Sequence, residues 1–313
     1  MAMNKGQDKS IKVLYTIAVI AGLLAFLFFI YPSLSDAWNR HISSLLITEY
    51  ENNVVQERDD SKIKEEIEKA TKYNEELYAS GNNHISEYTR KSQAEGFKDP
   101  KYESLLSDGD IMGYVDIPRI KEKLPIKHYT SEEVLQTSVG HLYGTSLPVG
   151  GKNTHAVISA HNALVTAKLF TDLDTMVVGD KFAINVGGKN LNYQVDEINT
   201  VLPKELDYLS IVDGEDHVTL LTCTPYGVNT HRLLVRGVRI ADDAEIKPKE
   251  SPAGPVEEFV DAPVFMLCLT GFGFLVAIAA IVFIWRKPKN KFDEDESDLD
   301  NTEDKDNGDN IIE

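Results

Sequence analysis

Cysteine is scarce in this chain of 313 residues, which has only Cys223 and Cys268. Cys268 lies inside a long apolar segment that looks membrane-spanning, so the middle of the chain has one thiol and nothing to pair it with. One cysteine and scattered histidines do not make a zinc site, and we expect no cofactor. A lone thiol is most often a small buried hydrophobe. On the oxidising side of a membrane, however, it is chemically exposed and is usually lost or paired unless it is used.

Basic residues are also in short supply. The chain has 32 Lys and Arg against 50 Asp and Glu, a formal net charge of −18. Much of the excess lies at the end, because eleven acidic residues and one lysine follow Phe292. We expect this tail to be disordered and solvated. The rest of the chain has no basic patch, which argues against a nucleic-acid partner.

Two long apolar runs are present. Residues 13–31 and 264–285 contain no charged side chain, and a helix needs about 20 apolar residues to cross a bilayer. The first run could be a cleaved signal peptide, but it exceeds the usual apolar core of one, so we favour an uncleaved anchor. Basic residues next to spans stay in the cytoplasm. Those flanking the two runs are Lys5, Lys9, Lys12, Arg286, Lys287, Lys289 and Lys291.

This pattern predicts a two-pass cell-membrane protein with both termini cytoplasmic and roughly residues 32–262 outside. Within that outer region, residues 33–110 are predicted to be mainly helical, since apolar residues recur at helical spacing from Ile63 to Leu77. From Ile111 the period changes to that of strands, with a hairpin signal at Gly187-Gly188 and a predicted helix at 166–176. Many short, regularly spaced strands indicate a mainly β fold, either a barrel or a sandwich.

Cys223 ends one of these predicted strands, 217–223. A loop containing Pro225 and Gly227 follows, and a second strand begins at Arg232. An antiparallel pair would bring Cys223 and Arg232 close together. A cysteine nucleophile also needs a proton-transfer partner and a donor to the oxyanion.

Histidine suits the proton-transfer role, because its ordinary pKa lies near neutrality. Of the eight histidines, His161 is preferred because it ends a short apolar strand. His141, His155 and His231 are expected to be surface or hydrogen-bonding side chains.

Several ordered motifs resemble one family. Thr219-Leu220-Leu221-Thr222-Cys223 resembles the TLxTC signature of the sortases, the surface transpeptidases of Gram-positive bacteria. The resemblance covers about Asp110 to Gly237, and its other segments are typical of class C sortases, which polymerise pilins. These segments are 140–151, 167–173, 224–227 and 231–237.

The resemblance implies an eight-stranded sortase β-barrel with N-terminal helices, flanked by two transmembrane helices. It places the nucleophile on Cys223, the histidine on His161 and the arginine on Arg232. It also implies a cysteine transpeptidase that cleaves an LPxTG-like sorting signal between Thr and Gly through a thioester. The thioester would then be resolved by a lysine, giving an isopeptide bond between pilin subunits. The implied partners are the membrane and pilins or surface proteins with C-terminal LPxTG-like signals.

Two alternatives remain open at this point. The same three residues would serve a sortase that anchors surface proteins to the cell wall, although the second span and the class C segments argue against it. A non-catalytic membrane scaffold that presents a β-domain is the other.

Class C sortases commonly carry an inhibitory lid with an Asp-Pro-aromatic motif. Here the chain has Asp99-Pro100-Lys101-Tyr102, with the aromatic residue displaced by one position. Asp99, Pro100 and Tyr102 are therefore possible lid residues, with an ordinary Asp-Pro turn as the alternative.

The predicted organisation has seven parts. These are a cytoplasmic N-terminus 1–12, a transmembrane helix 13–31, a helical region with a possible lid 32–110, the catalytic barrel 111–245, a linker 246–263, a second transmembrane helix 264–285 and an acidic cytoplasmic tail 286–313.

Overall fold

The computed structural model describes residues 5–56, 60–81, 97–107, 110–242, 244 and 262–286. The predicted acidic tail beyond residue 286 and most of the predicted linker lie outside these residues. The chain forms two compact units, one of residues 1–29 and 264–313 and the other of residues 30–263. The helices are α1 Lys5–Gln56, α2 Asp60–Ala79, α4 Pro100–Glu103, α5 Glu132–Leu135 and α6 Ala262–Trp285, with 3-10 turns η1 Leu173–Thr175 and η2 Asp207–Leu209. The strands are β1 Gly113–Ile117, β2 Glu122–His128, β3 Val139–His141, β4 Thr154–Ser159, β5 Lys181–Val186, β6 Lys189–Val201, β7 Asp216–Thr224 and β8 His231–Arg239.

The first unit is built from the start of α1 and from α6. Among the described residues, one helix is long and apolar enough to cross a membrane, the stretch Lys9–Asn53, whose most apolar window has a mean hydropathy of 2.7. The described apolar part of α6, Gly271–Trp285, is a shorter apolar helix. The indole Nε1 of Trp285 donates a hydrogen bond to Thr16 Oγ1 at 3.1 Å, so the two helices touch within this unit.

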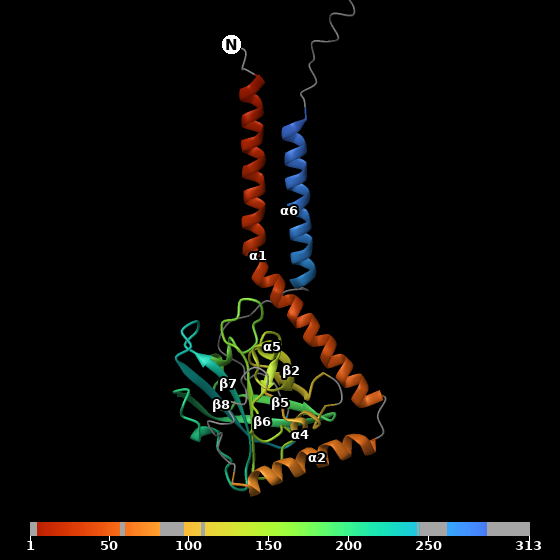
Figure 1. Cartoon of the computed structure of the whole chain (residues 1–313), viewed down its shortest axis with the longest axis vertical. Helices are drawn as coiled ribbons and strands as arrows, with labels where there is room; N and C mark the ends of the chain where they lie inside the picture. The colour runs from red at the N-terminus through yellow and green to blue at the C-terminus, as the bar shows by residue number, and fades with distance from the viewer. Residues whose placement is uncertain are drawn as a thin grey trace, which may run out of the picture. The chain divides into compact units, whose positions relative to one another are not determined.

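The second unit is a closed eight-stranded barrel, as predicted. The strand order is β1-β2-β3-β4-β7-β8-β6-β5 (Figure 1). The pairs β2/β3 and β4/β7 are parallel, and the other neighbours are antiparallel. The hairpin predicted at Gly187-Gly188 joins β5 to β6. Alternate residues of the strands fill the interior with large apolar side chains, including Phe182 and Tyr193, whose rings stack with centroids 5.6 Å apart.

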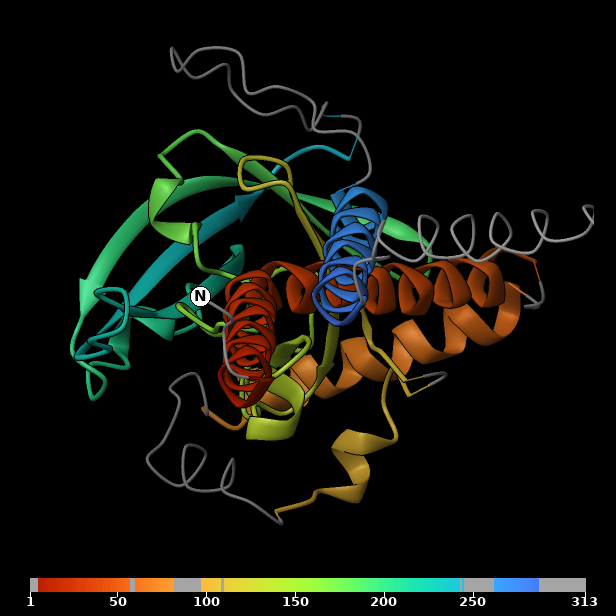
Figure 2. The same cartoon turned by 90° about the horizontal axis from the view of Figure 1, so that it is seen from above.

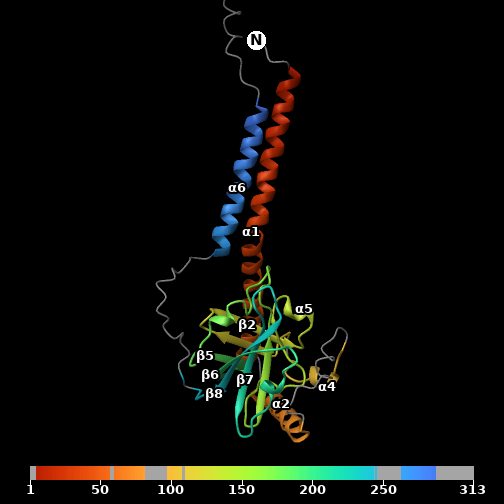
Figure 3. The ribbon, with the colours of Figure 1, turned by 90° about the vertical axis from the view of Figure 1, so that its left-hand side faces the viewer.

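The second half of α1 and α2 meet at one corner beside the barrel (Figures 1 and 2). Tyr50 of α1 donates from its hydroxyl to the Met112 carbonyl at 3.3 Å. Asn74 of α2 binds Leu147 twice, through both its amide nitrogen and its amide oxygen. Ala70 belongs to the barrel's own core cluster. The helices are thus fixed to the barrel, and α5 lies toward the end of the barrel opposite α2 (Figure 3).

The helix predicted at 166–176 is wrong, because only the short η1 turn forms there. The backbone of this segment forms isolated turns, such as the one closed by the Thr171 amide and the Lys168 carbonyl, and it also bonds to side chains of α1. Asn39 Nδ2 donates to the Thr166 carbonyl at 2.8 Å, and the Lys168 amide donates to Asp36 Oδ1 at 2.7 Å. Leu169 also has a positive φ of 42°, which an α-helix does not allow.

Candidate active site

The strand order brings the three predicted site residues together. β7 lies between β4 and β8. Cys223 near the end of β7 is the register partner of Arg232 in β8. On the other side, Ser159 of β4 pairs with Leu221 of β7, and His161 and Cys223 each lie two residues further along. His161 and Arg232 therefore flank Cys223 from opposite sides.

The three side chains lie on the outer face of the barrel wall. Side chains alternate across a strand, and Leu220 and Thr222 of β7 are fully buried, whereas Cys223 is half-buried. Together they line a cleft of about 250 Å³. Its walls come from the ends of β4, β7 and β8, the β2–β3 connection with α5, and the β6–β7 connection. The other lining residues are Thr130, Leu135, Leu142, Ser159, Ala160, Val201, Leu202, Pro203, Glu205, Leu206, Leu209, Leu221 and Leu234.

Hydrogen bonds fix the ends of β4 and β7 to each other. The Ala160 amide donates to the Leu221 carbonyl at 3.2 Å, and the Thr222 hydroxyl donates to the Ala160 carbonyl at 2.8 Å. Asn162 Nδ2 donates to the Cys223 carbonyl at 2.9 Å. The sequence reasoning missed Asn162, although its position directly after His161 was a usable signal.

His161 sits at the start of a closed loop, since its carbonyl accepts from the Phe170 amide at 3.2 Å. Its ring is 28% exposed, and Nε2 lies 3.6 Å from Glu132 Oε1. On the other side of the thiol, Arg232 Nη1 donates to the carbonyls of Asn229 and His231 at 3.2 and 3.0 Å. A guanidinium carries five N–H donors in a fixed plane, so these contacts orient the group and use only part of its donor capacity.

The β6–β7 connection forms an apolar wall over the cleft. Leu206 and Leu209 pack with Val157, Leu221 and Leu234 in a cluster outside the barrel core. This wall was not predicted from the sequence.

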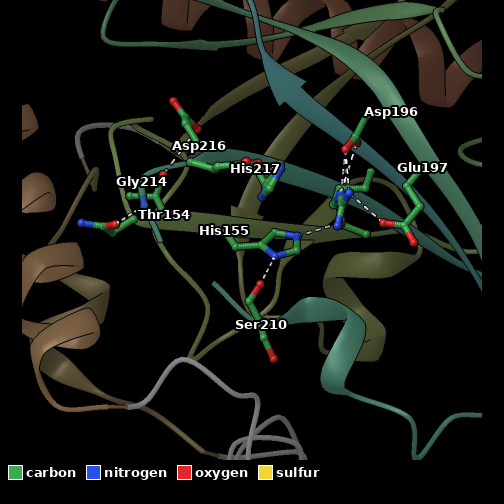
Figure 4. A network of polar contacts seen from close by, with 12 residues as sticks. Thr154, His155, Asp196, Glu197, Ser210, Gly214, Asp216 and His217 are labelled. Carbon is green, nitrogen blue, oxygen red and sulfur yellow. Dashed lines mark hydrogen bonds and ion pairs between the residues drawn. The ribbon is translucent and has the colours of Figure 1, made fainter. Parts of the chain in front are cut away.

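A buried histidine, His155, binds the β6–β7 connection at Ser210. His155 Nδ1 donates to the Ser210 carbonyl at 2.9 Å, and Nε2 accepts from the Thr219 hydroxyl at 2.7 Å (Figure 4). Burial lowers the pKa of His155 to about 4. His155 is therefore a neutral structural residue, in agreement with the prediction of a hydrogen-bonding role.

Arg236 lies two positions further along β8 than Leu234, which lines the cleft. It forms ion pairs with Asp196 at 2.6 Å and with Glu197 at 2.7 Å (Figure 4). The cleft-lining residues include Arg232 and not Arg236.

The possible lid residues lie in a segment docked on the barrel rather than among the described residues that line the cleft. Asp99 caps α4, with its side chain accepting from the amides of Lys101 and Tyr102. Tyr102 is fully buried and donates from its hydroxyl to His141 Nδ1 at 2.7 Å. Asp99 and Pro100 thus begin a short helix, and the possible lid role of Asp99, Pro100 and Tyr102 stays a prediction. Residues 82–96, which precede it, lie outside the described part.

Comparisons with known proteins agree with this architecture. Residues 115–240 match the family model described as the sortase domain. A crystal structure of sortase C1 from Streptococcus agalactiae is 43% identical, covers 63% of this chain and is itself 98% covered, with a TM-score of 0.56. A structure of sortase C-1 from Actinomyces oris is 40% identical over 58% of this chain and 99% of its own length, with a TM-score of 0.52.

Among curated proteins, Sortase A of Bacillus anthracis is 26% identical over 142 residues, which is 45% of this chain and 65% of that protein. The chain thus spans slightly less than two thirds of this relative. The chain belongs to the sortase family of cysteine transpeptidases, and within it to class C.

Proposed function

We propose that this protein is a pilin-polymerising transpeptidase whose catalytic residues are Cys223, His161 and Arg232. The observation that carries the proposal is the placement of a lone thiol between an imidazole and a guanidinium in one cleft. The class C relatives support the pilin assignment. Pilin polymerisation differs from anchoring to the wall in its second substrate, which is a lysine of another pilin instead of a wall peptide.

The first half of the reaction forms a thioester. The Cys223 thiolate attacks the threonine carbonyl of an LPxTG-like sorting signal, and the oxyanion accepts hydrogen bonds from the Arg232 guanidinium. The bond between threonine and glycine then breaks, and the glycine amine leaves with a proton from His161. The acyl chain stays on the Cys223 sulfur.

The second half transfers that chain. The ε-amine of a lysine on the next pilin attacks the thioester carbonyl, and the Cys223 sulfur leaves as a thiolate. His161 takes the proton that the attacking amine gives up, so the protonation state of the site is restored. The product is an isopeptide bond, and the reaction consumes no external energy source because the thioester conserves the peptide bond energy.

Mass spectrometry of the purified outer region with a sorting peptide tests the thiol. We expect an acyl adduct on wild-type protein that is absent in Cys223→Ala, with an unchanged circular dichroism spectrum. An adduct of equal amount in Cys223→Ala would rule out the assignment.

The apolar runs and their basic flanks support a two-pass topology with α6 as the second span and both termini cytoplasmic. Protease added to intact protoplasts should digest the region between the spans and spare an epitope tag placed after the acidic tail. Loss of the tag under these conditions would contradict this topology.

A further inference from the structure

One atom of the cleft histidine is in an unusual position. Nε2 of His161 is buried and has no hydrogen-bond partner among the described residues, although the ring as a whole is 28% exposed. The group it faces is the carboxylate of Glu132, whose Oε1 lies 3.6 Å away. This separation is that of an ion pair and slightly too long for a hydrogen bond.

The carboxylate is held in place by its own short helix. Ser131 caps α5, accepting from the Val134 amide at 3.4 Å. Gln136 Nε2 donates to Glu132 Oε1 at 2.5 Å, from one turn further along. The β2–β3 connection that carries α5 returns tightly against β3, because a Cβ at Gly140 would lie 2.2 Å from the Tyr129 carbonyl oxygen. The backbone that carries Glu132 is therefore fixed in position beside His161.

From this geometry we propose that Glu132 is a positioning residue, which orients the His161 ring by holding a carboxylate opposite Nε2. This leaves Nδ1 as the nitrogen that exchanges protons with the thiol and the substrate amines. A ring nitrogen fixed by a carboxylate, with the other nitrogen doing the chemistry, is a general way to control histidine. The inference rests on the proposed function of His161.

Other charged groups also lie near His161. Arg232 of β8 and Cys223 of β7 share the cleft, as does Glu205 of the β6–β7 connection. Glu205 accepts from the Leu202 amide at 2.8 Å, which engages its carboxylate within its own turn. Lys168 and Asp172, on the loop that begins at His161, pair with each other at 2.5 Å. Among the described residues, Glu132 is the acidic group that lies within ion-pair distance of the His161 ring.

The size of the effect follows from exposure. The Glu132 side chain is 73% exposed, so solvent and salt weaken its interaction with the ring. We expect Glu132→Gln to lower kcat for sorting-peptide cleavage about two- to five-fold, the range for an exposed ion pair. KM should change little, because the other residues that line the cleft are untouched.

The matched control is Glu133→Gln. Glu133 lies in the same first turn of α5, so its removal changes net charge and the helix end in the same way. Its kcat should equal that of wild type. Glu132→Asp keeps the charge and should recover part of the lost kcat, and the Glu132→Gln effect should nearly vanish at about 1 M salt.

Two results would overturn the inference. One is a kcat of Glu132→Gln equal to that of wild type at low salt, and the other is an equal loss of kcat in Glu133→Gln. Melting temperatures of both variants exclude unfolding as the cause. The proposed function fails separately, through absence of the Cys223 adduct in wild-type protein, so the two failures are distinguishable.

Discussion

Cys223 and Arg232 are direct register partners across the antiparallel strands β7 and β8. Paired residues project to the same face of a sheet with Cβ atoms about 5 Å apart. Both side chains line the same cleft, and the carbonyls of Asn229 and His231 hold the guanidinium at its edge. Arg236, the pair of Thr219, lies on the same face but is neutralised by Asp196 and Glu197.

This relationship predicts the outcome of two arginine substitutions. Arg232→Lys keeps the charge but loses the planar donor array that can bind an oxyanion. We expect turnover of a sorting peptide to fall by up to about 10²–10³, the range for loss of an oxyanion donor. The measurement is kcat for peptide cleavage.

Arg236→Lys is the control for this test. It should leave kcat within a few-fold of wild type while lowering the melting temperature slightly, because it weakens a partly exposed ion-pair network. If Arg236→Lys were inactive and Arg232→Lys near wild type, the wrong arginine would have been assigned to the cleft.

Local patterns predicted some of this site and could not predict the rest. The strand at 217–223, the loop and the strand at 232–239 follow from period-two alternation and turn residues, which are local in sequence. The closeness of Cys223 and Arg232 then follows from a single antiparallel pairing. The role of His161 depended on the family resemblance, because its position next to β7 requires the parallel β4/β7 pair, which no turn specifies.

The failed helix at 166–176 has a related cause. Its composition suits a helix, but its backbone is bound by Asn39 and Asp36 from a distant part of the chain. Such tertiary bonds override local propensity. Glu132 was missed for the same reason, since its relation to His161 exists only once β2, β3 and β4 are assembled.

Tyr102 should contribute strongly to stability. Its hydroxyl donates to Nδ1 of the fully buried His141, whose Nε2 donates to the Ser146 carbonyl at 2.8 Å. Tyr102→Phe leaves a buried acceptor without a donor, which costs about 1–3 kcal/mol. Denaturant unfolding of the outer region should show this loss in the free energy of unfolding.

Tyr208→Phe is the comparison, because Tyr208 is 45% exposed. It should stay within about 0.5 kcal/mol of wild type. Equal losses in the two variants would mean that the hydroxyl bond to His141 contributes nothing specific.

Acid should weaken the fold through His155. Burial lowers the pKa of this histidine from 6.5 to about 4. The unfolded chain thus binds a proton that the folded one refuses, so stability is complete above pH 6.5 and is lost as pH falls toward 4. Over that window the loss amounts to roughly 3 kcal/mol for one group.

His155→Gln removes this titration, so the free-energy difference between wild type and variant should shrink as pH falls from 6.5 to 4. Urea unfolding at several pH values measures it. Curves for the two proteins that run parallel across this window would contradict the assignment.

Glu122 should act in the opposite direction. Its side chain is 3% exposed, and Arg40 Nη2 lies 2.9 Å from Oε1 in an ion pair that lacks the geometry of a hydrogen bond. Burial raises the pKa of Glu122 from 4.5 to about 7, with Arg40 opposing the rise. The folded state therefore holds a proton that the unfolded chain releases. The resulting stabilisation is complete below pH 4.5 and is lost as pH rises to about 7.

Glu122→Gln stays neutral at every pH, and Arg40 keeps its second partner, Asp36, at 3.0 Å. Relative to wild type, the variant should gain stability between pH 4.5 and 7, by up to roughly 3 kcal/mol at pH 8. Unfolding free energies of the outer region at pH 4.5, 6 and 8 measure this gain, and the His155→Gln series serves as a control whose stability relative to wild type changes with pH in the opposite direction. A Glu122→Gln variant that loses stability relative to wild type as pH rises would mean that Glu122 is ionised in the fold, with the Arg40 contact outweighing burial.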